Sequence, residues 1–124
     1  MMRLKLTVLP NQLAICRLAT DAAMPSWVRG TFVSATRTPD ELSLVCDEEG
    51  IPREVNAQRG YRAIQVMGPI PFEATGIAAS LVAPLAQAKI SVFTIATYET
   101  DYVLVKEDVL DAAMDVLRVA NDFL

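Results

Sequence analysis

Histidine is absent from this chain of 124 residues, and its absence excludes more kinds of function than any other feature of the composition. Without an imidazole, Ser-His-Asp and Cys-His catalysis and histidine-based metal sites are all excluded. The five glycines are widely spaced and form no phosphate-binding motif. The three consecutive acids at residues 47–49 are more typical of a solvated turn than of a metal site. The sequence therefore predicts no enzyme, no metal site and no cofactor.

Basic residues are also scarce, since 11 Lys+Arg stand against 15 Asp+Glu and give a net charge of −4. DNA and anionic membranes attract clusters of Lys and Arg, which are scattered here. No apolar run approaches the roughly 20 residues that span a membrane. Charged and amide side chains between Lys5 and Asp21 interrupt the stretch that a secretory signal needs. We therefore expect a cytoplasmic protein that binds neither nucleic acid nor membrane.

Cysteine is limited to Cys16 and Cys46, each within an alternating apolar stretch. We interpret both as reduced core residues, and a disulfide or redox pair is the alternative. Apolar residues make up 52% of the chain, of which few are aromatic. A chain of this size and composition buries a core without disulfide or metal.

Strand signals dominate the first half of the chain. The turn Pro10-Asn11-Gln12 separates apolar stretches at residues 4–8 and 13–18 and predicts a hairpin. Residues 31–37 and 41–46 predict a second strand pair, and 61–68 a further strand. Residues 51–56 are ambiguous, and a short helix is one interpretation.

Helix signals appear in the second half. Thr75 is a candidate N-cap for a helix that continues to about Ala88, with Pro84 inside it. Strands are expected at 90–97 and 102–105, because β-branched residues are frequent there. The helix expected from Glu107 to about Asp122 has acids in its first turn and one apolar face.

An internal repeat relates the two halves. Residues 31–48 align on 91–108 without a gap, so that Ser34 falls on Thr94. Each copy reads as strand, helix, strand, strand, helix, which is the ferredoxin-like order of an α+β fold, with an antiparallel sheet and helices on one face. We expect tandem βαββαβ units at 1–60 and 61–124, with reduced helices in the first. The N-terminal half or a partner chain would supply the last strand of the second unit.

Two polar positions suggest how a ligand is held. The helix start at Gly76 offers free N–H groups that suit a carboxylate or phosphate, although simple capping by Thr75 explains the same residues. Asp101 lies in a polar turn where it can pair with an ammonium group, although an ordinary turn carboxylate is the alternative. Together they predict a receptor for a zwitterion such as an α-amino acid.

Residues 68–113 also resemble the ACT domains of small bacterial proteins and of CASTOR-type arginine sensors, which are similar to aspartate kinase regulatory domains. The resemblance lies in Gly76-Ile77, Pro84-Leu85-Ala86, Ile90-Ser91-Val92-Phe93, Ala96-Thr97-Tyr98, Thr100-Asp101-Tyr102 and Leu104-Val105. Residues 41–49 and 59–68 resemble the region that precedes this core.

The resemblance implies a non-catalytic regulatory protein, a homodimer that binds a small amino acid at an interface between ACT units. The ligand-binding residues that it implies are Gly76, Ile77, Ser91, Val92, Thr97, Tyr98 and Asp101. Ala74 stands where the arginine sensors have an acid, which disfavours arginine as the ligand. The alternative function is a structural dimerisation module without a ligand.

Overall fold

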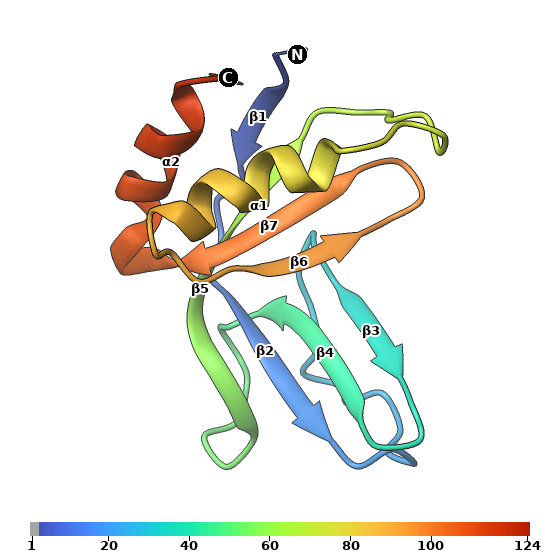
Figure 1. Cartoon of the computed structure of the whole chain (residues 1–124). Helices are drawn as coiled ribbons and strands as arrows, with labels where there is room; N and C mark the ends of the chain where they lie inside the picture. The colour runs from blue at the N-terminus through green and yellow to red at the C-terminus, as the bar shows by residue number, and fades with distance from the viewer. Residues whose placement is uncertain (1–2) are drawn as a thin grey trace. The chain divides into compact units, whose positions relative to one another are not determined.

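The computed structural model describes residues 3–124 and divides the chain into two compact units. Unit 1 combines the chain up to Pro10 with Arg62–Leu124, and unit 2 is Asn11–Tyr61. The long strand β5 (Asn56–Val66) begins in unit 2 and ends in unit 1. Figure 1 labels strands of both units and the two helices of unit 1.

Unit 2 is a four-stranded antiparallel sheet without helices. Its strands β2 (Leu13–Leu18), β3 (Ser34–Arg37), β4 (Leu42–Asp47) and the first part of β5 pair in the order β3-β4-β2-β5. The connections at 19–33 and 48–55 are loops and turns, so 51–56 holds no helix. The expectation that helices are reduced in the first unit is thus confirmed, and here they are lost entirely.

The core of unit 2 lies on one side of β2 and β4. Cys16, Leu44 and Cys46 are almost completely buried there, and Trp27 from the 19–33 loop packs against them. The ladder between β2 and β5 is irregular near Gly60, which has a left-handed φ of +79°. The Gly60 N–H donates to Glu48 Oε1 at 2.6 Å, so a carboxylate from the acidic run 47–49 satisfies the backbone donor at this irregular position.

Unit 1 has two α-helices and a mixed sheet. Its further elements are β1 (Lys5–Val8), α1 (Ile77–Gln87), β6 (Phe93–Ala96), β7 (Asp101–Lys106), a 3₁₀ turn η1 (Glu107–Val109), α2 (Leu110–Arg118) and β8 (Asp122–Phe123). The strand order is β6-β7-β5-β1-β8, in which β1 is antiparallel to β5 and β8 is parallel to β1.

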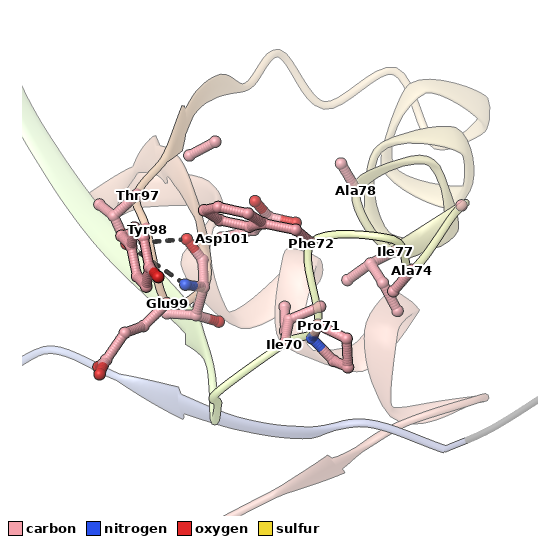
Figure 2. Close-up of a pocket in the computed structure, with 13 residues that line it drawn as sticks. Ile70, Pro71, Phe72, Ala74, Ile77, Ala78, Thr97, Tyr98, Glu99 and Asp101 are labelled. Carbon is pink, nitrogen blue, oxygen red and sulfur yellow. Dashed lines mark hydrogen bonds between the residues drawn. The ribbon is translucent and has the colours of Figure 1, made fainter.

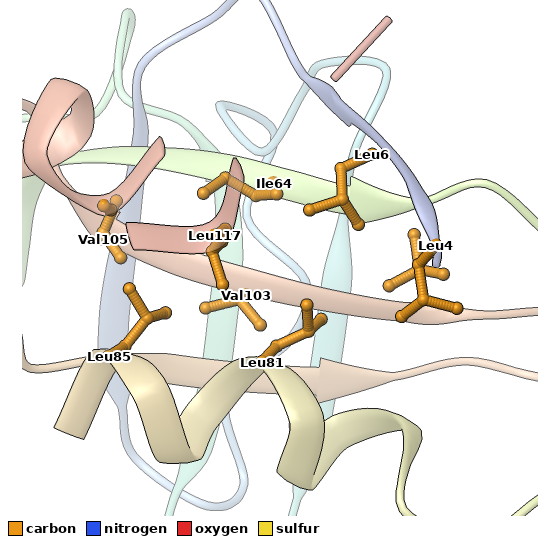
Figure 3. Close-up of a cluster of buried hydrophobic side chains, with 10 residues drawn as sticks. Leu4, Leu6, Ile64, Leu81, Leu85, Val103, Val105 and Leu117 are labelled. Carbon is orange, nitrogen blue, oxygen red and sulfur yellow. The ribbon is translucent and has the colours of Figure 1, made fainter. Parts of the chain in front are cut away.

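Both helices of unit 1 cover one face of its sheet. Leu81 and Leu85, four positions apart on α1, and Leu117 of α2 are completely or almost completely buried. They meet strand side chains from β1, β5 and β7, including Val103 and Val105 (Figure 3). The α+β, ferredoxin-like architecture expected from the sequence is confirmed, but the expectation of a purely antiparallel sheet is wrong, because β8 is parallel to β1.

The expected hairpin of residues 4–8 and 13–18 is wrong. β1 pairs with the end of β5 and with β8, whereas β2 pairs with β4 and with the start of β5. Both β1 and β2 are antiparallel to β5, so Pro10-Asn11-Gln12 does not fold the two strands back on each other, and a turn signal does not identify the pairing partner. Beyond α2, the short strand β8 replaces the helical end expected near Asp122.

The start of α1 also differs from the expectation. Gly76, and not Thr75, is the N-cap, and no side chain in the described part of the chain caps the helix. Gly76 has φ +79°, a conformation that residues with a Cβ rarely adopt. The helix therefore begins at the position after the one that the Thr75 signal suggested.

The internal repeat is present as two matching hairpins, but their alignment is shifted by one position. Ser34 is opposite Val45 in β3–β4, and Phe93 is opposite Leu104 in β6–β7, so Ser34 corresponds to Phe93 and not to Thr94. The buried runs 44–46 and 103–105 of the two inner strands correspond in the same alignment. A slip of one position exchanges the two faces of a strand, so the correction changes which side chains are equivalent.

The same hydrogen bonds close both hairpins. Thr38 N–H donates to Glu41 O at 2.9 Å, and Thr97 N–H donates to Thr100 O at 2.9 Å. The threonine hydroxyl oxygen then accepts from the N–H of Glu41 or Thr100, at 3.3 Å in each hairpin. The two turns are thus built alike although only their first residue is identical.

Candidate functional site

A pocket of about 370 Å³ lies in unit 1 between the segment that leads into α1 and the β6–β7 hairpin. Figure 2 shows the two groups of side chains facing each other. The lining residues are Ile70, Pro71, Phe72, Ala74, Gly76, Ile77, Ala78, Ala96, Thr97, Tyr98, Glu99, Thr100 and Asp101. The volume is at the lower end of the range for small-molecule sites, about 300–1,000 Å³.

The hairpin is fixed to the segment that follows β5. The buried Thr100 hydroxyl donates to the Val66 carbonyl oxygen at 2.5 Å, and Ile70 N–H donates to Glu99 O at 2.7 Å. Gly68 lies so close that a Cβ at this position would come within 2.9 Å of Glu99 O. The two walls of the pocket are therefore connected by one side-chain and one backbone hydrogen bond.

Two exposed aromatic rings meet beside the pocket. Phe72 and Tyr98 are 72% and 81% exposed, and their ring centroids are 4.7 Å apart at an interplanar angle of 65°. This edge-to-face geometry is a favourable one for aromatic pairs. Rings this exposed contribute little to the core, so they are available to cover a bound molecule.

The start of α1 provides the positive end of the pocket. The first N–H groups of a helix have no partner within the helix, and here no side chain among residues 3–124 caps them. The first turn of α1 also contains no acid that would offset the positive end of the helix dipole. A carboxylate is a suitable ligand group for such a helix end.

Carboxylates provide the negative part of the pocket. Asp101 and Glu99 are its charged lining residues, and the lining includes neither Lys nor Arg. In Figure 2 the Glu99 side chain extends away from the facing wall, which leaves Asp101 as the better placed acid. The pocket is therefore lined by the N-terminal end of a helix and by a carboxylate.

The structure brings together five of the seven residues expected at the site: Gly76, Ile77, Thr97, Tyr98 and Asp101. Ser91 and Val92 are not part of the lining. Ser91 is exposed before β6, and Val92 packs against the core of unit 1.

Sequence reasoning missed Phe72 and Ile70. Both lie in the proline-containing segment 69–72, which has no helix or strand period that would indicate where a side chain points. The one available signal was an isolated phenylalanine outside every predicted core element.

The cysteines lie outside this pocket. Burial raises the pKa of the Cys16 thiol to about 11 and also raises the pKa of Cys46. Both are free thiols in the core of unit 2, and at neutral pH they are protonated.

Two further observations concern membrane-spanning helices and metal sites. No helix within residues 3–124 is long and apolar enough to cross a membrane. Over the same residues, no three potential metal ligands of the His, Cys, Asp or Glu type come together.

Comparison with known proteins identifies the class of the chain. A family model described as ACT domain matches residues 56–119, which is more than half of the chain, so the chain belongs to the ACT domain family. A second model, of an N-terminal domain, matches residues 11–54.

Among particular relatives, the cytosolic arginine sensor for mTORC1 subunit 1 of Rattus norvegicus is 34% identical over 115 residues. The match covers 81% of this chain and 33% of the sensor, so the chain spans about a third of the length of such relatives.

Solved structures agree with this class. The protein Atu0741 from Agobacterium tumefaciens has a TM-score of 0.93 at 37% identity, over 100% of this chain and 94% of that one. The regulatory subunit of aspartate kinase from Thermus thermophilus has a TM-score of 0.60 at 12% identity, over 93% and 95% of the two chains. At that identity the second match shows the fold alone. The chain is an ACT-domain regulatory module related to amino-acid sensing domains.

Proposed function

We propose that this chain is a non-catalytic regulatory protein that binds a small amino acid in the pocket between the start of α1 and the β6–β7 hairpin. The observation that carries the proposal is the convergence of Gly76, Ile77, Thr97, Tyr98 and Asp101 on one pocket. The name of the rat relative, an arginine sensor, also supports an amino acid as the ligand.

Each end of the pocket has a role in this proposal. The N–H groups at the start of α1 bind the ligand carboxylate, and the Asp101 carboxylate binds the ligand ammonium group. Thr97 and Tyr98 form the hairpin wall, with Phe72 opposite. Ala74 contributes no charge, which favours a small ligand over a strongly cationic one.

Two further parts of the proposal concern organisation. We place the protein in the cytoplasm as a homodimer, with the ligand held between ACT units. We also interpret residues 1–60 and 61–124 as two ACT-like copies, which the matching β3–β4 and β6–β7 hairpins support.

A thermal-shift screen of the twenty amino acids at millimolar concentration tests the proposal. A ligand at about 100 times its Kd stabilises a protein by about 2.7 kcal/mol, which raises the Tm by several degrees. Asp101→Asn should remove the shift, because the ammonium group loses its counter-charge. Glu99→Gln is the matched control and should retain the shift, since that side chain extends away from the facing wall.

The outcomes separate the two candidate functions. An amino acid that stabilises the wild type and Glu99→Gln, but not Asp101→Asn, supports the proposal. No shift with any of the twenty, or an equal shift in both variants, contradicts it and favours the dimerisation module without a ligand.

A further inference from the structure

A second pocket, of about 290 Å³, lies in unit 1 against the turn of the β6–β7 hairpin. The residues of that turn, 97–100, line both this pocket and the first one. Further lining residues of the second pocket are Gln65, Met67, Pro69 and Tyr102. Its volume is just below the range of drug-sized sites, about 300–1,000 Å³, so a ligand that fits it is small.

The two pockets lie on opposite faces of the sheet of unit 1. Val66 of β5 and Val103 of β7 belong to the core under the helices. Successive side chains of a strand point to opposite faces, so Gln65 and Tyr102 point away from the helices. The first pocket includes the start of α1 and therefore lies on the helix side. The second pocket is thus a separate site, although the same turn forms part of its wall.

Glu99 is the charged residue of the second pocket, whose lining includes neither Lys nor Arg. In Figure 2 the Glu99 side chain extends away from the wall that faces the hairpin across the first pocket. Within residues 3–124 it forms no ion pair with another side chain. Its negative charge is therefore available to a ligand.

Aromatic and aliphatic groups accompany this charge. Tyr98 and Tyr102 precede and follow Glu99 in the hairpin, and Pro69 and Met67 add aliphatic surface. The face of a tyrosine ring attracts an organic cation, which the carboxylate attracts as well. The carbon atoms of such a cation also suit the aliphatic groups. The lining thus combines the groups that recognise a positively charged nitrogen with carbon substituents.

The same lining disfavours other classes of ligand. A hard metal ion takes several oxygen ligands at once. No three potential ligands of the His, Cys, Asp or Glu type come together in the part of the chain that the structure describes. An amino acid carries a carboxylate, which Glu99 repels and which no Lys or Arg of the lining balances. The ligand that fits therefore has a positive charge and no negative one.

We propose that the second pocket binds a small organic cation without a carboxylate, such as a quaternary ammonium compound. Glu99 balances the charge of the ligand, and the rings of Tyr98 and Tyr102 contact the carbon atoms on its nitrogen. The net charge of −4 on the chain attracts a ligand of the same class.

An NMR titration of the backbone amide signals of the full chain tests the proposal. The probe is choline chloride at millimolar concentration, with sodium chloride at the same ionic strength as the reference. The matched probe is the neutral alcohol in which a carbon atom replaces the choline nitrogen, because it keeps the shape and lacks the charge. We expect choline to shift the signals of Gln65, Met67 and residues 98–102. The neutral alcohol should bind at least about fivefold more weakly.

Three variants test the roles of the side chains, with circular dichroism as the check of folding. Glu99→Gln should weaken choline binding about three- to fivefold, because it removes the counter-charge. Tyr102→Leu keeps an apolar side chain without a ring face and should weaken binding about two- to fivefold. Glu73→Gln is the matched control, since Glu73 is an exposed acid of the same unit that lines neither pocket. It should bind choline as the wild type does.

Four results would overturn the proposal. They are no shift with choline, shifts confined to residues outside this lining, equal binding of the neutral alcohol, and equal losses in Glu73→Gln and Glu99→Gln. The comparison of the two probes uses the wild type and does not depend on a variant folding. No amino acid is present, so the result is independent of the ligand screen for the first pocket.

Discussion

The hydroxyl of Thr100 provides a direct measure of how firmly the pocket hairpin is attached. It donates to the Val66 carbonyl oxygen at 2.5 Å, and Thr100 is 5% exposed. Thr100→Val keeps the shape of the side chain but leaves that carbonyl without its donor. A lost hydrogen bond of this kind costs about 1–3 kcal/mol, and the methyl group that replaces the hydroxyl returns about 0.8 kcal/mol. We expect a net loss of about 0.2–2.2 kcal/mol.

Urea denaturation followed by circular dichroism measures this loss as a lower midpoint at constant slope. Thr97→Val is the matched control, because the Thr97 hydroxyl donates to Thr100 O at 3.0 Å and accepts from Thr100 N–H at 3.3 Å in an exposed residue where water replaces both bonds. Its expected loss is below about 0.5 kcal/mol. Equal losses in the two variants, or a stable Thr100→Val, would refute the view that this buried bond fixes the hairpin.

Three other predictions use the same assay. Gly76→Ala should cost about 1–2 kcal/mol through its positive φ alone, since a Cβ there meets nothing within 4 Å, and Gly76→Asn should cost less. Leu81→Ala should cost about 2–5 kcal/mol, whereas Val119→Ala, at an 82% exposed position, should be nearly neutral. Burial raises the pKa of the Cys16 thiol from 9.0 to about 11, so the thiol loses its proton at lower pH in the unfolded chain than in the folded one. The free energy of unfolding should therefore fall as the pH rises between these two values. The fall should be smaller in Cys16→Ala.

Much of the fold was predictable from the sequence, because the residue patterns that indicate its hairpins and helices are local. The β3–β4 and β6–β7 pairs and both helices follow from apolar periodicity and turn residues close in sequence. The pairing of β1 and β2 was not predictable in this way. Both strands pair with β5, which lies far along the chain from either, and nothing in a local turn specifies so distant a partner.

The alignment of the repeat shows a similar limit. Side-chain types alone favoured Thr94 as the equivalent of Ser34, whereas the strand pairing and the matching backbone bonds of Thr38 and Thr97 establish Phe93. Strands β3 and β6 have only four residues each, so neighbouring alignments differ in only a few matches. The hydrogen-bond register distinguishes them because it depends on the backbone.

The candidate site was predictable where the residues lie in recognisable elements, such as Gly76 at a helix start and Asp101 at a strand start. Phe72 was not predictable, because its position follows from the attachment of the 67–71 segment to Glu99 and Thr100. Ser91 and Val92 were expected at the site from the family resemblance alone, and they are not among the residues that line the pocket.

Because the chain contains a single tryptophan, indole fluorescence reports on only one of its two units. Trp27 packs in the core of unit 2, so its emission follows the opening of that core. Tyr98 and Tyr102 belong to unit 1, and Tyr98 lies beside the pocket, whereas Tyr61 is the tyrosine of unit 2. In Tyr61→Phe, indole emission therefore follows unit 2 and tyrosine emission follows unit 1 in one cuvette. Emission from Tyr98 should respond to an occupant of the pocket even when that of Trp27 does not change.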